Sequence, residues 1–340
     1  MANCNHLFND FNDRVRLTDP KRKTLANTRE ILREKISGYF RENSSLNIPR
    51  FQSQGSFVMD TIINPIEGDY DLDDGVYFVG NLSKEQRPST QTVHKSVMDA
   101  IGSHTDNVVD KNTCIRVIYS EGYHIDLPMY YAQYISSPDL AHKKDGWILS
   151  NPIEFVAWFE AKANSGFQKA FLYEERMLDR YRGWLDEIRK NDVQLRRIIR
   201  YLKAWGDYKK GEMPPGIIMT ILGTENYEEN IRDDKAFLGT LKQIKNSLDR
   251  EFVCRRPTTP EGEDLFKDYS QTRKDYFMNA LSSFIKSGEE AVENPNQKEA
   301  CYKWQKHFGS RFSCAYAKDE IENATAFAAP SVIRGNAKSA

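Results

Sequence analysis

The chain has 340 residues, and its 48 Lys plus Arg nearly balance 49 Asp plus Glu, giving a formal net charge of −1. This balance excludes a global positive field that gathers DNA or RNA, so no stable nucleic-acid partner is expected. Hydrophobic residues at 39% and charged residues at 29% exclude a disordered chain and indicate a folded protein with a well-charged surface.

Apolar segments and cysteines predict where the protein resides. The apolar run at residues 216–222 is too short to cross a bilayer, and residues 1–18 lack the apolar core of a signal peptide. The cysteines are odd in number and lack Cys-x-x-Cys spacing, which argues against a disulfide framework or a thiolate zinc site. We therefore expect a cytoplasmic protein with no membrane contact and with reduced thiols at Cys4, Cys114, Cys254, Cys301 and Cys314.

The first predicted element is a long amphipathic helix over residues 18–42. Thr18 offers an N-cap, Pro20 suits the first turn, and apolar residues then recur at helical spacing in a charged background. A shorter helix is expected over residues 93–101. Two strands, 114–119 and 123–131, should follow as a hairpin that turns at a glycine.

Carboxylates interrupt two of the apolar strands. Asp71 and Asp73 lie two residues apart, so on an extended strand both point to the same face. Asp126 lies between two apolar residues of the later strand. Three carboxylates brought together would hold divalent cations through hard oxygen ligands. The alternative is a solvated loop, in which the acids at Asp69, Asp71, Asp73 and Asp74 simply face water.

A Gly-Ser pair stands shortly before the first of these strands. Gly55 lets the backbone approach an anion, and the Ser56 hydroxyl can donate to a phosphate oxygen. A helix starting at Phe57 would aim its free N–H groups at the same oxygens. Taken alone, the pair is also compatible with an ordinary turn.

The second half of the chain changes to helical periodicity. Apolar residues recur at helical spacing through 155–162, 171–190, 195–208, 231–252, 276–286 and 297–308. We predict an α/β lobe at residues 1–150, a helical lobe at 151–322 and a flexible tail at 323–340, which has little apolar mass. A nucleotide would bind in the cleft between the lobes.

Several motifs together resemble one enzyme family. Gln54-Gly55-Ser56-Phe57, then Asp71-Leu72-Asp73-Asp74-Gly75, then His124-Ile125-Asp126-Leu127-Pro128 resemble the signature of polymerase β-like nucleotidyltransferases. The helix at 195–205 resembles the one with which bacterial cGAS/DncV-like nucleotidyltransferases (CD-NTases) place a lysine on the triphosphate. The resemblance implies an α+β fold: a bilobed core, in which a mixed sheet accompanies a long N-terminal helix, plus an α-helical C-terminal lobe.

The resemblance also implies residue roles. Asp71, Asp73 and Asp126 would be catalytic and would bind two Mg²⁺ ions, with Mn²⁺ as an alternative ion. Nucleotide binding is implied for Gln54, Gly55, Ser56 and Lys203. Without the family, a lysine on an amphipathic helix is more often a surface residue. Further candidates for phosphate contacts are Arg197 and Arg200. Candidates for base stacking are Tyr77, Tyr123, Tyr130, Trp147 and Trp205, with 147–152 as the base-lining stretch.

One departure from the family concerns the segment after the lysine helix. Where relatives carry Pro-Ser-Gly, this chain has Pro214-Pro215-Gly216, which lacks the hydroxyl.

The implied activity is synthesis of a cyclic oligonucleotide, such as cyclic GMP-AMP, from ATP and GTP with release of pyrophosphate, in antiphage (CBASS) signalling. The implied partners are nucleoside triphosphates and, at Ala340, a protein that conjugates or regulates the tail. The alternatives are a template-independent transferase that acts on RNA ends or a protein hydroxyl, and a degenerate scaffold without activity.

Overall fold

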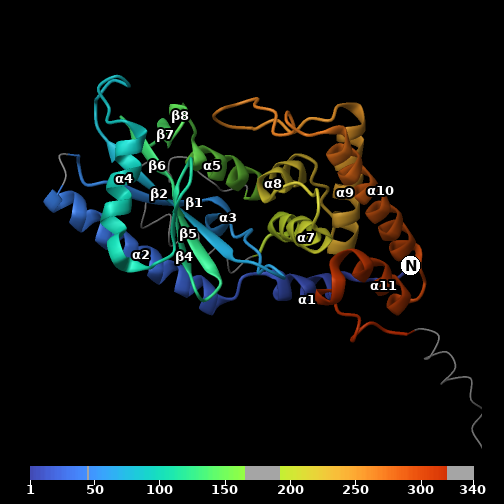
Figure 1. Cartoon of the computed structure of the whole chain (residues 1–340). Helices are drawn as coiled ribbons and strands as arrows, with labels where there is room; N and C mark the ends of the chain where they lie inside the picture. Colours follow the sequence, from blue (N-terminus) through green and yellow to red (C-terminus); the bar gives the residue numbers. More distant parts are fainter. Residues whose placement is uncertain (44–45, 165–191, 320–340) are drawn as a thin grey trace, which may run out of the picture.

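The computed structural model describes residues 1–43, 46–164 and 192–319 (Figure 1). The predicted helix at 171–190 and the predicted tail at 323–340, with Ala340, lie outside the described residues. Within the described ranges no helix is long and apolar enough to traverse a lipid bilayer.

A single mixed sheet contains the eight strands of the described ranges, in the order β3-β4-β5-β2-β6-β7-β8, with β1 paired to β2. Their bounds are Arg50–Gln54 (β1), Tyr70–Val79 (β2), Val108–Asp110 (β3), Ile115–Tyr119 (β4), Tyr123–Leu127 (β5), Met129–Ala132 (β6), Pro138–His142 (β7) and Gly146–Leu149 (β8). The predicted hairpin is confirmed: β4 and β5 pair antiparallel across Gly122, whose φ is +76°. The single strand predicted over 123–131 is divided at Pro128, which has no N–H for the ladder.

β2 is the central strand of this sheet. It runs parallel to both β5 and β6, and antiparallel to β1. The long N-terminal helix is confirmed as α2 (Asp19–Asn43), which packs against α4 (Thr90–Ile101) and the sheet. Apolar residues at helical spacing on α2 are buried there: Leu25, Leu32, Ile36 and Phe40. The predicted mixed sheet with a long N-terminal helix is therefore confirmed.

The helical half follows the sheet along the chain, beside it in Figure 1. It contains α5 (Pro152–Ala163), α7 (Gln194–Lys209), α8 (Gly216–Glu225), α9 (Asp233–Arg250), α10 (Gln271–Glu293) and α11 (Gln297–Phe308). Three short helices are also present: α3 (Gly55–Val58), η1 (Gly102–His104) and η4 (Gly309–Arg311). The boundary near residue 150 stays a prediction.

Two helices were not predicted. α1 (Asn5–Val15) packs into the helical half, where the Phe8 ring meets the rings of Tyr201 and Trp304 at centroid distances of 5.2 and 5.0 Å. The N-terminus therefore lies beside α11 rather than on the sheet (Figure 1). α8 is buried along most of its length, so its apolar run carries no polar side that would reveal a helical period.

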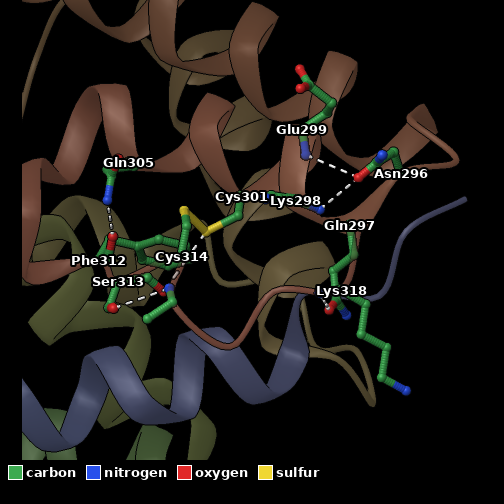
Figure 2. The surroundings of a disulfide bond; sticks show 11 residues. Asn296, Gln297, Lys298, Glu299, Cys301, Gln305, Phe312, Ser313, Cys314 and Lys318 are labelled. Atoms are coloured by element: carbon green, nitrogen blue, oxygen red, sulfur yellow. Dashed lines mark hydrogen bonds between the residues drawn. A yellow bond between two sulfur atoms is a disulfide. The ribbon is translucent and has the colours of Figure 1, made fainter. Parts of the chain in front are cut away.

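The prediction that all cysteines are reduced is wrong for one pair. Cys301 of α11 and Cys314 form a disulfide, shown in Figure 2. After α11 the chain reverses at Gly309, whose φ is +71°, and Gln305 Nε2 donates to Phe312 O at 2.7 Å on the return. Sequence spacing cannot show such a reversal. Burial raises the pKa to about 12 for the free, buried thiols of Cys4, Cys114 and Cys254.

Candidate active site

A cavity of about 690 Å³ lies where the sheet meets the helical half. Its lining includes the three carboxylates and the four nucleotide-binding residues that the family resemblance implied: Gln54, Gly55, Ser56, Asp71, Asp73, Asp126 and Lys203. These residues come from β1, α3, β2, β5 and α7. Segments separated by some 150 residues of chain are thus brought to one cavity by the fold.

The carboxylates converge through strand pairing. In the parallel register of β2 and β5, Asp73 lies opposite Asp126, and Asp71 lies opposite His124. Asp71 and Asp73 share a face because strand side chains alternate. Burial, followed by the charges of Asp71 and Asp126, raises the pKa of Asp73 well above its usual value. A cluster of repelling carboxylates, in which Asp126 is buried and Asp71 and Asp73 are half-buried, is chemically suited to a divalent cation.

Arg116 of β4 neutralises one of these carboxylates. Its Nε and Nη2 atoms donate to Asp126 Oδ1 and Oδ2 at 2.7 and 2.6 Å. Among the described residues, no three His, Cys, Asp or Glu side chains are arranged as a formed metal site. The carboxylate oxygens nevertheless fit a cation, because both oxygens of Asp126 already accept hydrogen bonds from the positively charged Arg116 guanidinium. Sequence reasoning missed Arg116, although it stands in the strand that was predicted to pair with Asp126.

Arg116→Gln is expected to strengthen Mg²⁺ binding, because a cation no longer has to displace the guanidinium from Asp126. Removing about 1.4 kcal/mol of competition would lower the half-saturating Mg²⁺ concentration about tenfold. A thermal-shift titration with Mg²⁺, without nucleotide, measures this half-saturating concentration. Arg87→Gln, which removes a similar contact to Asp139 at 2.7 Å, is the control and should leave the Mg²⁺ titration unchanged. Weaker binding in Arg116→Gln would show that Arg116 holds Asp126 in place for the cation.

Gly55 brings the backbone directly against the carboxylates. Its φ is +68°, in the left-handed region that favours glycine, and a Cβ atom there would overlap the Asp73 carboxylate. The short helix α3 begins at Gly55 itself, two residues earlier than predicted. The Ser56 carbonyl accepts from the amides of Thr61 and Ile62 at 3.0 and 3.2 Å, which closes the turn.

Gln54 is buried and hydrogen-bonded on both sides of its amide. Its Nε2 donates to Tyr130 Oη at 3.1 Å, and its Oε1 accepts from Tyr77 Oη at 3.2 Å. These contacts fix the end of β1 immediately before the Gly-Ser turn. Its direct contact with a nucleotide stays a prediction.

Lys203 reaches the cavity from α7. Its Nζ donates to Thr61 O at 3.2 Å and to Thr61 Oγ1 at 3.1 Å. Burial lowers its pKa to about 8, although the charge of Asp71 opposes this. Gly216, the first residue of α8, lies beside the Lys203 side chain, so the Pro-Pro-Gly segment that departs from the family borders the lysine.

The two other basic residues predicted for phosphates are engaged elsewhere. Arg197 pairs with Asp233 at 2.6 Å, and Arg200 pairs with Asp192 at 2.5 Å. Neither is among the described residues that line the cavity. Their position on the helix placed them near the lysine, but acidic side chains outside the cavity lining pair with both guanidinium groups.

The flanking acids divide by strand face. Asp74 is fully buried on the face opposite to Asp73, where it accepts from Arg33 Nε at 2.6 Å and from Ser53 Oγ at 2.8 Å. Asp69 lines the cavity and lies 3.7 Å from His124. The alternative of a solvated acidic loop is therefore wrong for most of this cluster.

Most aromatic residues proposed for base stacking are packed elsewhere. Trp205 packs on Phe284, and Trp147 donates to Pro88 O at 3.1 Å. Tyr77 is fully buried, and Tyr123 stacks on Tyr119. Lining residues include Tyr130 and also Tyr70, Ser150, Asn151, Pro152, Arg256 and Thr259. Arg256 and Thr259, from the segment after α9, were missed because nothing local in the sequence marks them.

Two family models match the chain. One, described as "Cyclic GMP-AMP synthase DncV-like, nucleotidyltransferase domain", matches residues 49–130, and the other, "Cyclic GMP-AMP synthase, C-terminal domain", matches residues 192–318.

Curated relatives and solved structures give the same picture. A cyclic GMP-AMP synthase of Escherichia coli is 26% identical over 82% of this chain and 71% of its own length. A c-di-GMP synthase of Roseivirga ehrenbergii is 24% identical over 67% of this chain and 64% of its own length. The structure of Vibrio cholerae DncV with a linear intermediate has a TM-score of 0.70 at 20% identity, covering 92% of this chain and 98% of that one. The chain belongs to the DncV-like nucleotidyltransferase family.

Proposed function

We propose that this protein synthesises a cyclic dinucleotide, such as cyclic GMP-AMP, from ATP and GTP with release of pyrophosphate. The observation that carries the proposal is the register of β2 and β5, in which Asp73 lies opposite Asp126 in a cavity that also contains the Gly55-Ser56 turn and Lys203. Carboxylates and a phosphate-binding turn on one wall, facing a lysine on another, suit nucleotidyl transfer. Family membership supports the same reaction class.

Asp71, Asp73 and Asp126 are the residues that would hold divalent cations, most simply two Mg²⁺ ions. Bound there, such ions lower the pKa of an attacking hydroxyl and stabilise charge on the leaving pyrophosphate. The protein's own part is to hold the three carboxylates close together, and the parallel pairing of β2 and β5 supports this role.

The remaining residues would bind the triphosphate and orient the reactants. The Ser56 hydroxyl would donate to a phosphate oxygen, and the Lys203 ammonium would pair with the phosphate chain. Asp126 would help to take the proton of the acceptor hydroxyl. Because one cavity serves both transfers, the linear intermediate would have to turn over between them.

Triphosphate binding is expected to weaken above about pH 8, where the free protein's Lys203 loses its proton. The bound polyanion favours the ammonium, so binding in this range requires proton uptake, and Kd should rise about tenfold per pH unit. Calorimetry with a nonhydrolysable GTP analogue, in two buffers of different ionisation enthalpy, measures both effects. In the control Lys203→Arg, whose side chain stays charged, the dependence should vanish. Equal slopes in both proteins would contradict the assignment of Lys203.

The function is tested by incubating the protein with Mg²⁺ and all four labelled nucleoside triphosphates, followed by phosphatase treatment and mass spectrometry. A phosphatase-resistant small product with the mass of a cyclic dinucleotide supports the proposal, and its fragments identify bases and linkage. Label transferred to RNA ends or to a protein hydroxyl would instead support the alternative transferase. Unreacted nucleotides under all metal conditions would support an inactive scaffold.

The biological setting proposed for the product is antiphage signalling in the cytoplasm. Conjugation of Ala340 to a partner protein is part of that proposal. Expressing the protein with its native neighbouring genes, with and without the last residues, should give a conjugate of higher mass only for the full chain. A single unshifted band for the full chain would refute it.

A further inference from the structure

Asp60 follows the Gly55-Ser56 turn closely in the chain. It follows α3 by two residues, its side chain is 2% exposed, and its φ of +52° is unusual for a residue with a side chain. A carboxylate so deeply buried needs compensation by positive groups. The fold must therefore supply positively charged groups around Asp60.

Three arginines from different parts of the chain surround this carboxylate. Arg22 of α2 contacts Oδ1 at 2.7 Å, and Arg16, which follows α1, contacts Oδ2 at 2.8 Å. Arg200 of α7 lies 3.6 Å from Oδ2 and also donates to the Asp60 carbonyl at 2.5 Å. The Arg22 and Arg200 side chains are almost entirely buried. One carboxylate therefore joins three helices to the segment after the turn.

Two of these helices, α2 and α7, also hold the backbone on either side of Asp60. We call residues 57–61 the bridge segment. Arg22 donates to Phe57 O at 3.1 Å, and Arg196, itself paired with buried Glu160, donates to Met59 O. Lys203 donates to both oxygens of Thr61. The bridge segment thus connects Ser56 at its start to Lys203 at its end.

We propose that Asp60 is a positioning residue, which sets the spacing between Ser56 and Lys203 and so forms the triphosphate subsite. The proposal rests on the proposed function. Asp60 is not among the described residues that line the cavity, so it acts through the bridge segment and not by contact with the nucleotide. Arg16, Arg22 and Arg200 transmit this constraint from the helices.

The direction in which triphosphate affinity changes when Asp60 is neutralised distinguishes a positioning role from a purely electrostatic one. A carboxylate near an anion site repels the anion, so neutralising it should tighten triphosphate binding if charge alone matters. If Asp60 positions the subsite, neutralising it releases the arginines, loosens the bridge segment and weakens binding. A residue important only for stability would change Tm and leave the KM of the folded protein unaltered.

The test compares Asp60→Asn with the control Asp139→Asn, a buried carboxylate that Arg87 and Lys84 contact at 2.7 and 3.0 Å away from the bridge segment. Each protein is assayed below its Tm for the Kd of inorganic tripolyphosphate and for KM and kcat with ATP and GTP. We expect Asp60→Asn to raise both Kd and KM about tenfold, and Asp139→Asn to lower Tm with Kd unchanged. Unchanged or tighter tripolyphosphate binding in Asp60→Asn would overturn the proposal.

A milder variant keeps the test decisive if Asp60→Asn does not fold. Arg16→Gln removes the most exposed of the three arginines, and we expect a rise of Kd of about threefold, whereas no change would overturn the proposal. Binding is measured separately from products. Tripolyphosphate binding that depends on Asp60, without any cyclic product, would reject the proposed function and keep the positioning role.

Discussion

The double variant Asp71→Asn/Asp73→Asn is expected to lose turnover while gaining thermal stability in the absence of metal. An amide cannot replace a carboxylate as a ligand of hard cations, and the several kcal/mol that a cation contributes correspond to about a 10³-fold or greater loss of kcat/KM. The gain in stability has a different cause. Burial and two neighbouring carboxylates disfavour the charge on Asp73, and the variant removes that charge.

The pH dependence of stability follows with a definite sign. The pKa of Asp73 is raised in the folded protein, so the folded state retains a proton that the unfolded state releases. The stability that this proton contributes is complete below the ordinary value of 3.8 and is lost as pH rises through the folded pKa. The Tm of the metal-free wild type should fall as pH rises across this range. The Tm of the variant should fall less. Added Mg²⁺ should stabilise only the wild type.

The adjacent acid provides a control with the opposite sign. Asp74→Asn leaves Arg33 without its buried carboxylate, so it should destabilise the protein by about 3 kcal/mol. It should leave the Mg²⁺-induced rise in Tm intact, because Asp74 lies on the other face of β2. Full turnover in Asp71→Asn/Asp73→Asn, or a lower Tm in that variant without metal, would refute the metal-site assignment.

Gly55→Ala is expected to cause the second largest loss. The left-handed φ of +68° costs an alanine about 1–2 kcal/mol of stability. Its Cβ would also displace the Asp73 carboxylate, and misplacement of a catalytic group by about 1 Å costs about 10²-fold in rate. Steady-state kinetics with ATP and GTP, combined with denaturant unfolding, measure both effects.

Gly146→Ala separates the two causes. Gly146 has a similar φ of +74°, but no atom lies within 4 Å of the position of its Cβ. We expect a similar loss of stability with turnover unchanged. If both alanine variants lost turnover equally, or if Gly55→Ala retained it, contact between Gly55 and Asp73 would not be what the site requires.

Local patterns were sufficient wherever a residue's role depends on the periodicity of its own segment. Alternation along β2 predicted that Asp71 and Asp73 share a face, and the turn glycine predicted the hairpin that carries Asp126. Helical spacing likewise placed Lys203 on α7. In α8 the same method failed because a helix buried on nearly all sides has no polar face to set a period.

Contacts between distant segments could not be predicted, since charge alone matches any acid with many bases. Asp73 and Asp74 are neighbours with similar local sequence, yet one faces the cavity and the other pairs with Arg33 of α2. The disulfide of Cys301 depends on a reversal after α11. Arg197 and Arg200 were assigned to phosphates from their position beside the lysine, but both pair with acids outside the cavity.

By itself, the sequence determined the order of most elements and the chemical types available to the site, because both follow from backbone periodicity and residue identity. Only the tertiary structure decided which groups meet. It decided the parallel register that sets Asp73 opposite Asp126, the pairing of Arg116 with both oxygens of Asp126, and the arginines around Asp60. Those contacts arise when strands and helices pack, and packing depends on the shape and burial of the whole molecule, which no single segment encodes.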